Sequence, residues 1–133
     1  MVDVWQPANT LPAGPDLTLV EKLAALSAEL EQHDDLDQFL SADDLAAARS
    51  WIQLSEAQWL PVIKQLEAES RLKLALFYTL AEVKLNGWQA GDKNPAIWIF
   101  RFLKQTHQLP EKNFIRLLKS KTDNRFIPYG SVL

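Results

Sequence analysis

The amino-acid sequence predicts an all-α fold, an irregular bundle of five or six helices with a non-helical arm at each end. Apolar residues recur at intervals of three and four along most of the chain, which is the spacing of a helix with one buried face. Capping residues precede most of these segments. With 133 residues, of which 47% are hydrophobic, the chain has the size and composition of one globular domain.

Composition divides the chain into three parts. Three prolines and a glycine predict an extended arm over residues 1–15, because proline removes backbone donors and disfavours helix before it. A single helical domain is expected over residues 16–121. An aromatic tail follows over residues 122–133, and it cannot be regular helix through Pro128.

Two helices are predicted in the first part of the domain. Asp16 is placed to cap a helix over residues 17–32. We expect this helix to end near His33, because the acidic residues there oppose the negative end of a helix dipole. Ser41 stands before a second helix that continues through Ile52, and acidic residues in its first turn support that start.

The next segment has a clear start and an ambiguous middle. Ser55 and Gln58 form a capping box, and Pro61 is expected to kink the helix that follows. The apolar stripe then loses phase, so that either Ser70 caps a new helix or one bent helix runs over residues 56–85. The Asn-Gly pair directly afterwards is typical of a helix end.

Asn94 and Pro95 mark the next helix start, as N-cap and first helical residue. Residues 97–103 are β-branched and aromatic, as strands often are. We nevertheless predict a helix there, because the chain supplies no obvious partner strand and a lone strand leaves its backbone unsatisfied. A last helix is expected over residues 109–120. The predicted core comprises Leu23, Leu26, Leu30, Leu45, Trp51, Ile63, Leu66, Leu76, Phe77, Leu80, Ile97, Phe100 and Leu103.

The net charge of −3 is unevenly distributed. Residues 1–92 carry 6 basic and 15 acidic side chains, whereas residues 93–133 carry 8 basic and 2 acidic ones. Either the two parts attract each other, within the fold or between the copies of a homodimer, or the basic end meets an anionic partner. We favour attraction between the two parts, because mild local imbalance of charge is common.

The composition also argues against several classes of protein. No apolar run is long enough to span a bilayer, and no secretory signal pattern is present, so we expect no membrane association and a cytoplasmic location. The absence of cysteine excludes disulfides and thiolate sites. No catalytic motif or phosphate loop is visible, and we predict no catalytic residues, metal or cofactor. An enzyme assembled from residues distant in sequence remains an open alternative.

Two local clusters carry weaker signals. His33 stands among acidic residues, but it has no second ligand at metal-binding spacing, and we interpret the cluster as a solvated helix end. Lys93 and Asn94 lie at a predicted helix start, where free amides can contact an anion. We favour the simpler interpretation that Asn94 caps its own helix.

The basic end can be aligned with a divergent helix-turn-helix over residues 103–121, with Leu103, Leu109, Phe114 and Leu117 at its apolar positions. A long side chain at Lys104 and the absence of a turn glycine both argue against this motif. The candidate nucleic-acid contacts are Lys104, Lys112, Arg116, Lys119 and Lys121.

The C-terminal tail contains the candidate contacts to a partner. Arg125, Phe126, Ile127 and Tyr129 are of the types that anchor protein interfaces, although the tail could equally fold back over the body. We therefore expect a small non-catalytic protein-interaction domain, adaptor or regulatory, whose partner is another protein. The alternative is a small DNA-binding regulator that uses residues 103–121.

Overall fold

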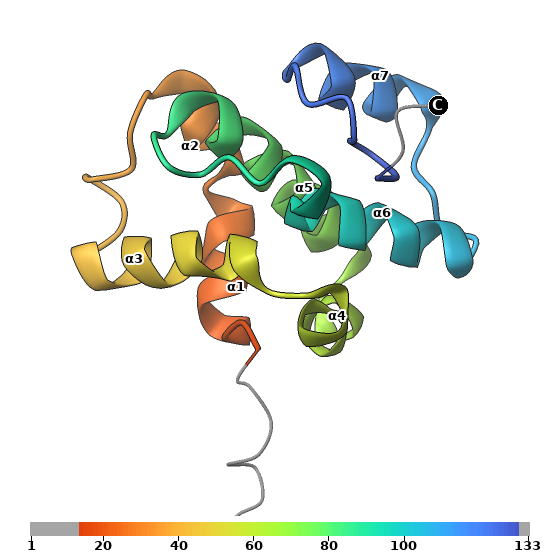
Figure 1. Cartoon of the computed structure of the whole chain (residues 1–133), viewed down its shortest axis with the longest axis horizontal. Coiled ribbons are helices and arrows are strands. Elements are labelled where there is room, and N and C mark those ends of the chain that lie inside the picture. The colour runs from red at the N-terminus through yellow and green to blue at the C-terminus, as the bar shows by residue number, and fades with distance from the viewer. Residues whose placement is uncertain (1–13, 131–133) are drawn as a thin grey trace, which may run out of the picture.

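A computed structural model describes residues 14–130, and the regular structure in this part of the chain consists of helices, with no strand (Figure 1). The all-α prediction is therefore confirmed, with seven α-helices in this part of the chain rather than five or six. Most of the predicted N-terminal arm lies outside the described residues. The helices are α1 (Leu17–Ala25), α2 (Ser27–Gln32), α3 (Ala42–Ser50), α4 (Glu56–Gln65), α5 (Ala68–Lys84), α6 (Pro95–Gln105) and α7 (Lys112–Ser120), with short 3-10 turns η2 (Trp51–Gln53) and η3 (Gly91–Lys93).

The additional helix arises because the segment predicted as one helix over residues 17–32 is broken at Leu26. The amide of Leu26 still donates to the carbonyls of Lys22 and Leu23, but a new helix starts at Ser27. No glycine or proline marks this break, so periodicity alone does not locate it. Asp16 caps α1 as predicted, through a bond from the amide of Leu19.

The boundary between α4 and α5 also differs from both predicted alternatives. The chain is extended at Leu66 and Glu67, three residues before Ser70, and α5 begins at Ala68. Arg71 in α5 explains how α4 can end there. Its guanidinium donates to the carbonyls of Ile63 and Lys64, which lie in the last turn of α4. The predicted capping box of Ser55 and Gln58 at the start of α4 is confirmed.

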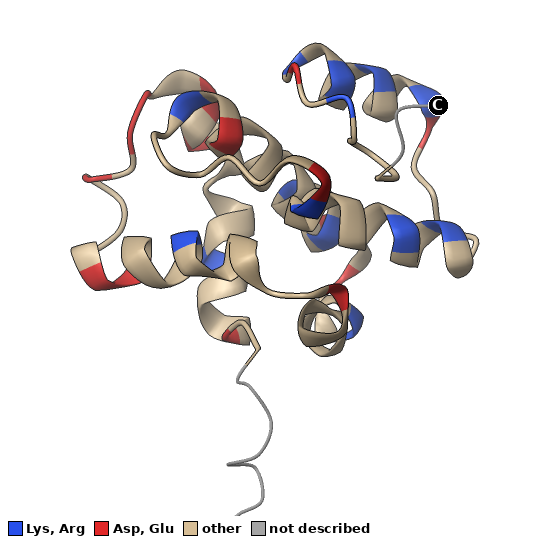
Figure 2. Cartoon of the chain, in the orientation of Figure 1, with Lys and Arg blue, Asp and Glu red and all other residues tan. Residues whose placement is uncertain are grey.

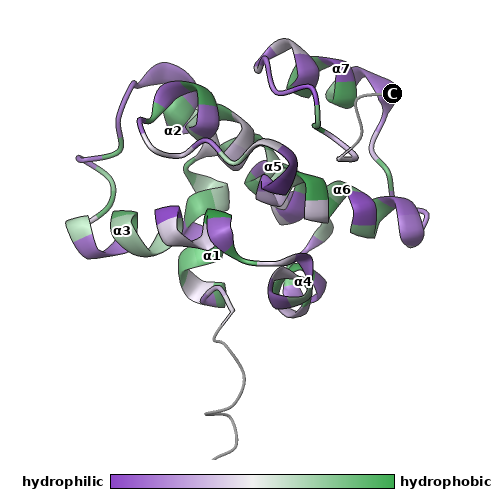
Figure 3. Ribbon diagram, in the orientation of Figure 1, coloured by the Kyte–Doolittle hydropathy of each residue, from purple (hydrophilic) through white to green (hydrophobic). Residues whose placement is uncertain are grey.

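Helix α5 is the centre of the bundle. It packs against α1, α2 and α6, and α4 packs against α6. Every residue of α5 from Leu74 to Glu82 is buried. Around this centre, helices such as α4 and α7 carry hydrophobic and hydrophilic residues side by side (Figure 3). Ten of the thirteen predicted core residues are buried, and the half-buried ones are Leu26, Leu45 and Trp51.

The turn after α5 requires the glycine of the Asn-Gly pair. Gly87 has a φ of 85°, in the left-handed region that favours glycine. The reversal brings Trp88 back onto α5, where its ring lies 6.1 Å from that of Phe77 and 6.2 Å from that of Tyr78. Trp59 adds an edge contact to Tyr78 at 5.5 Å. The aromatic residues of this region thus fill the core.

Ionic contacts join the acidic and basic parts of the chain. Lys121 pairs with Glu31 at 3.3 Å and Arg101 with Glu56 at 3.4 Å.

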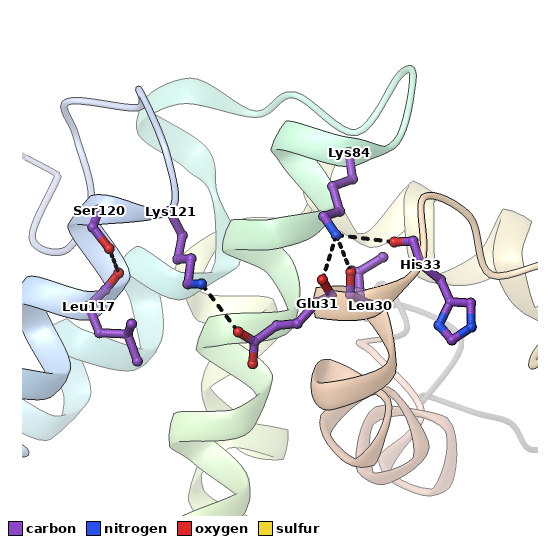
Figure 4. A network of polar contacts seen from close by, with 7 residues as sticks. All are labelled: Leu30, Glu31, His33, Lys84, Leu117, Ser120 and Lys121. Carbon is purple, nitrogen blue, oxygen red and sulfur yellow. Dashed lines mark hydrogen bonds and ion pairs between the residues drawn. The ribbon is translucent and has the colours of Figure 1, made fainter.

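Lys84 places its ammonium at the end of α2, where it donates to the carbonyls of Leu30, Glu31 and His33 (Figure 4). A cation from α5 therefore offsets the acidic sequence at this helix end.

No helix within residues 14–130 has both the length and the apolar character needed to cross a bilayer.

Candidate binding cleft

The C-terminal tail folds back from α7 toward the start of α6 (Figure 1). Ile127 is only 1% exposed, and the ring of Tyr129 lies 6.4 Å from that of Phe100 in α6. Ile127 is therefore a core residue, and the expectation that it contacts a partner is corrected. Burial of this apolar side chain in the core is more favourable than its exposure to water. Phe126 and Tyr129 are half-buried, and Arg125 is exposed.

A cleft of about 380 Å³ separates part of the tail from the loop that follows α5. One end of the tail is fixed to this loop, because the side-chain amide of Asn124 donates to the carbonyl of Gly91 at 2.8 Å. We call this hollow the tail cleft. It is lined by Glu82, Gln89 and Gly91 on the side of α5 and the loop, and by Asp123, Asn124, Arg125 and Phe126 of the tail.

Glu82 is a buried carboxylate with an uneven set of partners. It is 8% exposed, and its Oε1 accepts hydrogen bonds from the amide of Ala90 at 2.9 Å, the amide of Gly91 at 3.2 Å and Asn94 Nδ2 at 3.3 Å. In residues 14–130 no group donates to Oε2, and no lysine or arginine pairs with the carboxylate. The three donors compensate part of the cost of burying a charge and fix the shape of the loop.

The two residues predicted to contact an anion have separate roles. Asn94 is fully buried, and its Oδ1 accepts from the amide of Ala96 at 2.8 Å while its Nδ2 donates to the carbonyl of Tyr78. The favoured interpretation, that Asn94 caps its own helix, is therefore confirmed, and this side chain is not available to an anion. Lys93 is exposed and lines a different hollow, of about 310 Å³, with Gln53.

The five predicted nucleic-acid contacts fall into two groups. Lys112, Arg116 and Lys119 are exposed on α7, and their spacing of four and three places them on one side of the helix. Figure 2 shows basic residues along the ribbon of α7. Lys121 instead pairs with Glu31, and the ammonium of Lys104 lies 5.0 Å from the ring centre of Tyr129. We call the first three residues the basic face of α7.

The packing of α7 differs from that expected of a helix-turn-helix. Of the four residues predicted at the apolar positions of that motif, two are exposed: Leu109 is 40% exposed and Leu117 is 43% exposed. The side of α7 that contacts the body carries Phe114, as predicted, together with Ile115 and Leu118. The assignment of Leu117 to the buried side is therefore wrong.

Neither histidine faces the tail cleft. His33 Nδ1 lies 2.9 Å from the carbonyl oxygen of Glu29, and the ring packs edge-on against Phe39. His107 is exposed in the turn between α6 and α7. Within residues 14–130, no three histidine or acidic side chains are grouped as a metal site would require.

The sequence reasoning missed Glu82, although a signal for it exists. Glu82 follows Ala75 by seven residues and Tyr78 by four, so it lies on the stripe of α5 that faces the core. A single charged residue on such a stripe calls for a partner or a function. No family model, curated protein or solved structure matches this chain.

Proposed function

We propose that the protein is a small non-catalytic interaction module that binds a partner protein through the tail cleft. The observation that carries this proposal is the composition of the cleft. An exposed arginine and a half-buried aromatic ring, Arg125 and Phe126, stand beside the buried carboxylate of Glu82. Arginine and aromatic side chains supply most of the binding energy in many protein interfaces.

Different residues of the tail attach it to the body and line the tail cleft, which supports the cleft as the binding surface. Ile127 is buried in the core, and Tyr129 contacts α6, where its carbonyl oxygen accepts a hydrogen bond from Arg101 Nε at 3.2 Å. Arg125 and Phe126 lie beside the cleft and remain accessible to different degrees. A preformed cleft reduces the ordering cost that a partner must overcome on binding.

Capture experiments with matched variants test the proposal. The immobilised protein should retain a partner from nuclease-treated cell extract, and the purified partner should bind it again in isolation. The double variant Arg125→Ala, Phe126→Ala should weaken that binding at least roughly tenfold, as the loss of interface anchors does. Replacing the basic face of α7 with alanines should leave it unchanged. Undiminished binding by the double variant would contradict the proposal.

The variants must be point substitutions. Deleting residues 122–133 would also remove Ile127 from the core, so a loss of binding after that deletion would not separate contact from stability.

Nucleic acid is the second candidate partner, favoured by the basic face of α7. Its three cations are exposed, and none forms an ion pair with another group of residues 14–130. Such a row of cations suits phosphate contacts. Duplex DNA binding followed by fluorescence anisotropy should weaken steeply with salt, and alanine at all three positions should flatten that dependence. No binding at low salt would contradict this candidate.

A further inference from the structure

We propose that the tail cleft binds a primary ammonium group carried on an apolar stem, with Glu82 as its counter-ion. This inference deepens the proposed function, on which the choice of a protein-borne amine such as a lysine side chain rests. The chemistry of the cleft itself is independent of that choice.

The carboxylate of Glu82 has no counter-ion among residues 14–130. The residue is 8% exposed and lines the cleft. Each carboxylate oxygen can accept more than one hydrogen bond, so an oxygen without a donor at the wall of a cleft can accept one from a ligand. Oε1 has three donors and Oε2 has none from the described residues, so Oε2 is the atom left for a ligand.

The hydrogen bonds that Glu82 already accepts favour an ammonium over a guanidinium as its ligand. A guanidinium binds a carboxylate best through two parallel hydrogen bonds, one to each oxygen. Here Oε1 is already occupied by the amides of Ala90 and Gly91 and by Asn94, which excludes that fork geometry. An ammonium is a point charge that needs a single acceptor from the carboxylate, and its other donors can reach neighbouring oxygens or water.

The cleft also offers an apolar surface to the stem of the ligand. Phe126 lines the same cleft and offers a partly exposed aromatic ring. The face of such a ring can contact an alkyl chain and can attract a cation. The exposed carboxylate of Asp123 adds negative charge at the rim, whereas Arg125 opposes a cation there. Removing the charge of Arg125 should therefore strengthen ammonium binding, the opposite of its expected effect on a partner protein.

Titration of the ¹⁵N-labelled protein with n-butylammonium tests the inference directly. The amides of Ala90 and Gly91 should shift with saturation in the wild type, because they donate to the carboxylate that the ligand contacts. n-Butanol, with the same stem and no charge, should not produce these shifts. An unresponsive cleft, or equal responses to the two compounds, would overturn the inference without any variant being needed.

Variants then test whether Glu82 is the counter-ion of the bound ammonium. Glu82→Gln keeps an oxygen for the three donors and removes the charge, so n-butylammonium should bind at least roughly tenfold more weakly. Asp92→Asn is the matched control, since Asp92 is exposed next to Gly91 but does not line the tail cleft; it should change the affinity less than twofold. Binding that survives Glu82→Gln would overturn the inference. Arg125→Ala should raise the affinity.

A peptide arm distinguishes the two sources of the amine. A short apolar peptide with one lysine should compete with n-butylammonium, and the same peptide with acetyl-lysine should not. If n-butylammonium binds and the lysine peptide does not, the cleft takes a small amine, so the ammonium site stands and the choice of a protein-borne lysine is overturned, while the capture experiment with the Arg125 and Phe126 variant decides the proposed function. If a partner protein is captured without any response of the cleft to n-butylammonium, the proposed function holds and this inference fails.

Discussion

Tyr78 in α5 donates its hydroxyl hydrogen to the main-chain oxygen of Ala48 in α3 at 3.0 Å, and both residues are buried. The bond gives a partner to one of the last carbonyls of α3 and links two helices distant in sequence. Tyr78→Phe should lower the free energy of unfolding by about 1 kcal/mol at neutral pH, the usual contribution of such a bond. Urea denaturation measures this change. Tyr129→Phe is the control, with a half-buried ring, and should cost less.

Burial also raises the pKa of Tyr78 well above its ordinary value of 10.0. The unfolded chain therefore releases this proton at a lower pH than the folded protein does. The contribution of Tyr78 to stability is complete below pH 10.0 and is lost as the pH rises from there toward the folded-state pKa. Between neutral pH and about pH 11, the wild type should lose more stability than Tyr78→Phe. Equal losses in the two proteins would contradict this assignment.

Lys84 is expected to stabilise the junction of α2 and α5. Its ammonium donates to three carbonyls at the end of α2, at 2.7, 3.0 and 3.2 Å. Lys84→Met keeps the aliphatic stem and removes the donors, so it should lower the free energy of unfolding by about 1–2 kcal/mol. Lys73→Met removes a lysine whose ion pair with Glu69 is exposed, and should have little effect. Equal effects of the two substitutions would show that the carbonyl contacts of Lys84 contribute little.

His107 occupies a backbone position that suits glycine. It has a φ of 58°, and the turn after α6 is a Schellman motif, in which the amide of Gln108 donates to the carbonyl of Leu103 and that of His107 to Lys104. His107→Gly should raise the free energy of unfolding by about 0.5–1 kcal/mol, because it removes the strain of a Cβ in the left-handed region. His107→Ala keeps this Cβ and should give no gain. Thermal melts of the two variants would reveal whether backbone strain, rather than the imidazole, is responsible.

Ile127 fixes the tail to the body. Ile127→Ala should cost about 2–4 kcal/mol, as expected for a cavity in a packed core, and should make the tail more sensitive to limited proteolysis. Ile115→Ala, at a half-buried position of α7, should cost less. A tail that stays as protease-resistant as in the wild type would mean that other contacts hold it.

Local sequence signals were sufficient for most helix starts. Asp16, Ser41, Ser55 and Asn94 each cap the helix that they were predicted to begin, because a cap depends on residues within one turn. The same signals failed at Leu26 and at Leu66, where helices end without glycine or proline. At Leu66 the end is made tolerable by Arg71, a residue of the next helix.

The sequence by itself determined the helical class, most of the core and the presence of separate acidic and basic parts, since these depend on periodicity and composition. The tertiary structure decided which of the charges meet, as in the pairing of Lys121 with Glu31, and it turned the tail inward at Ile127. It alone brought Glu82 to the tail cleft beside Phe126, residues separated by more than forty positions. Such contacts depend on how the helices pack against one another, which no local pattern of residues encodes.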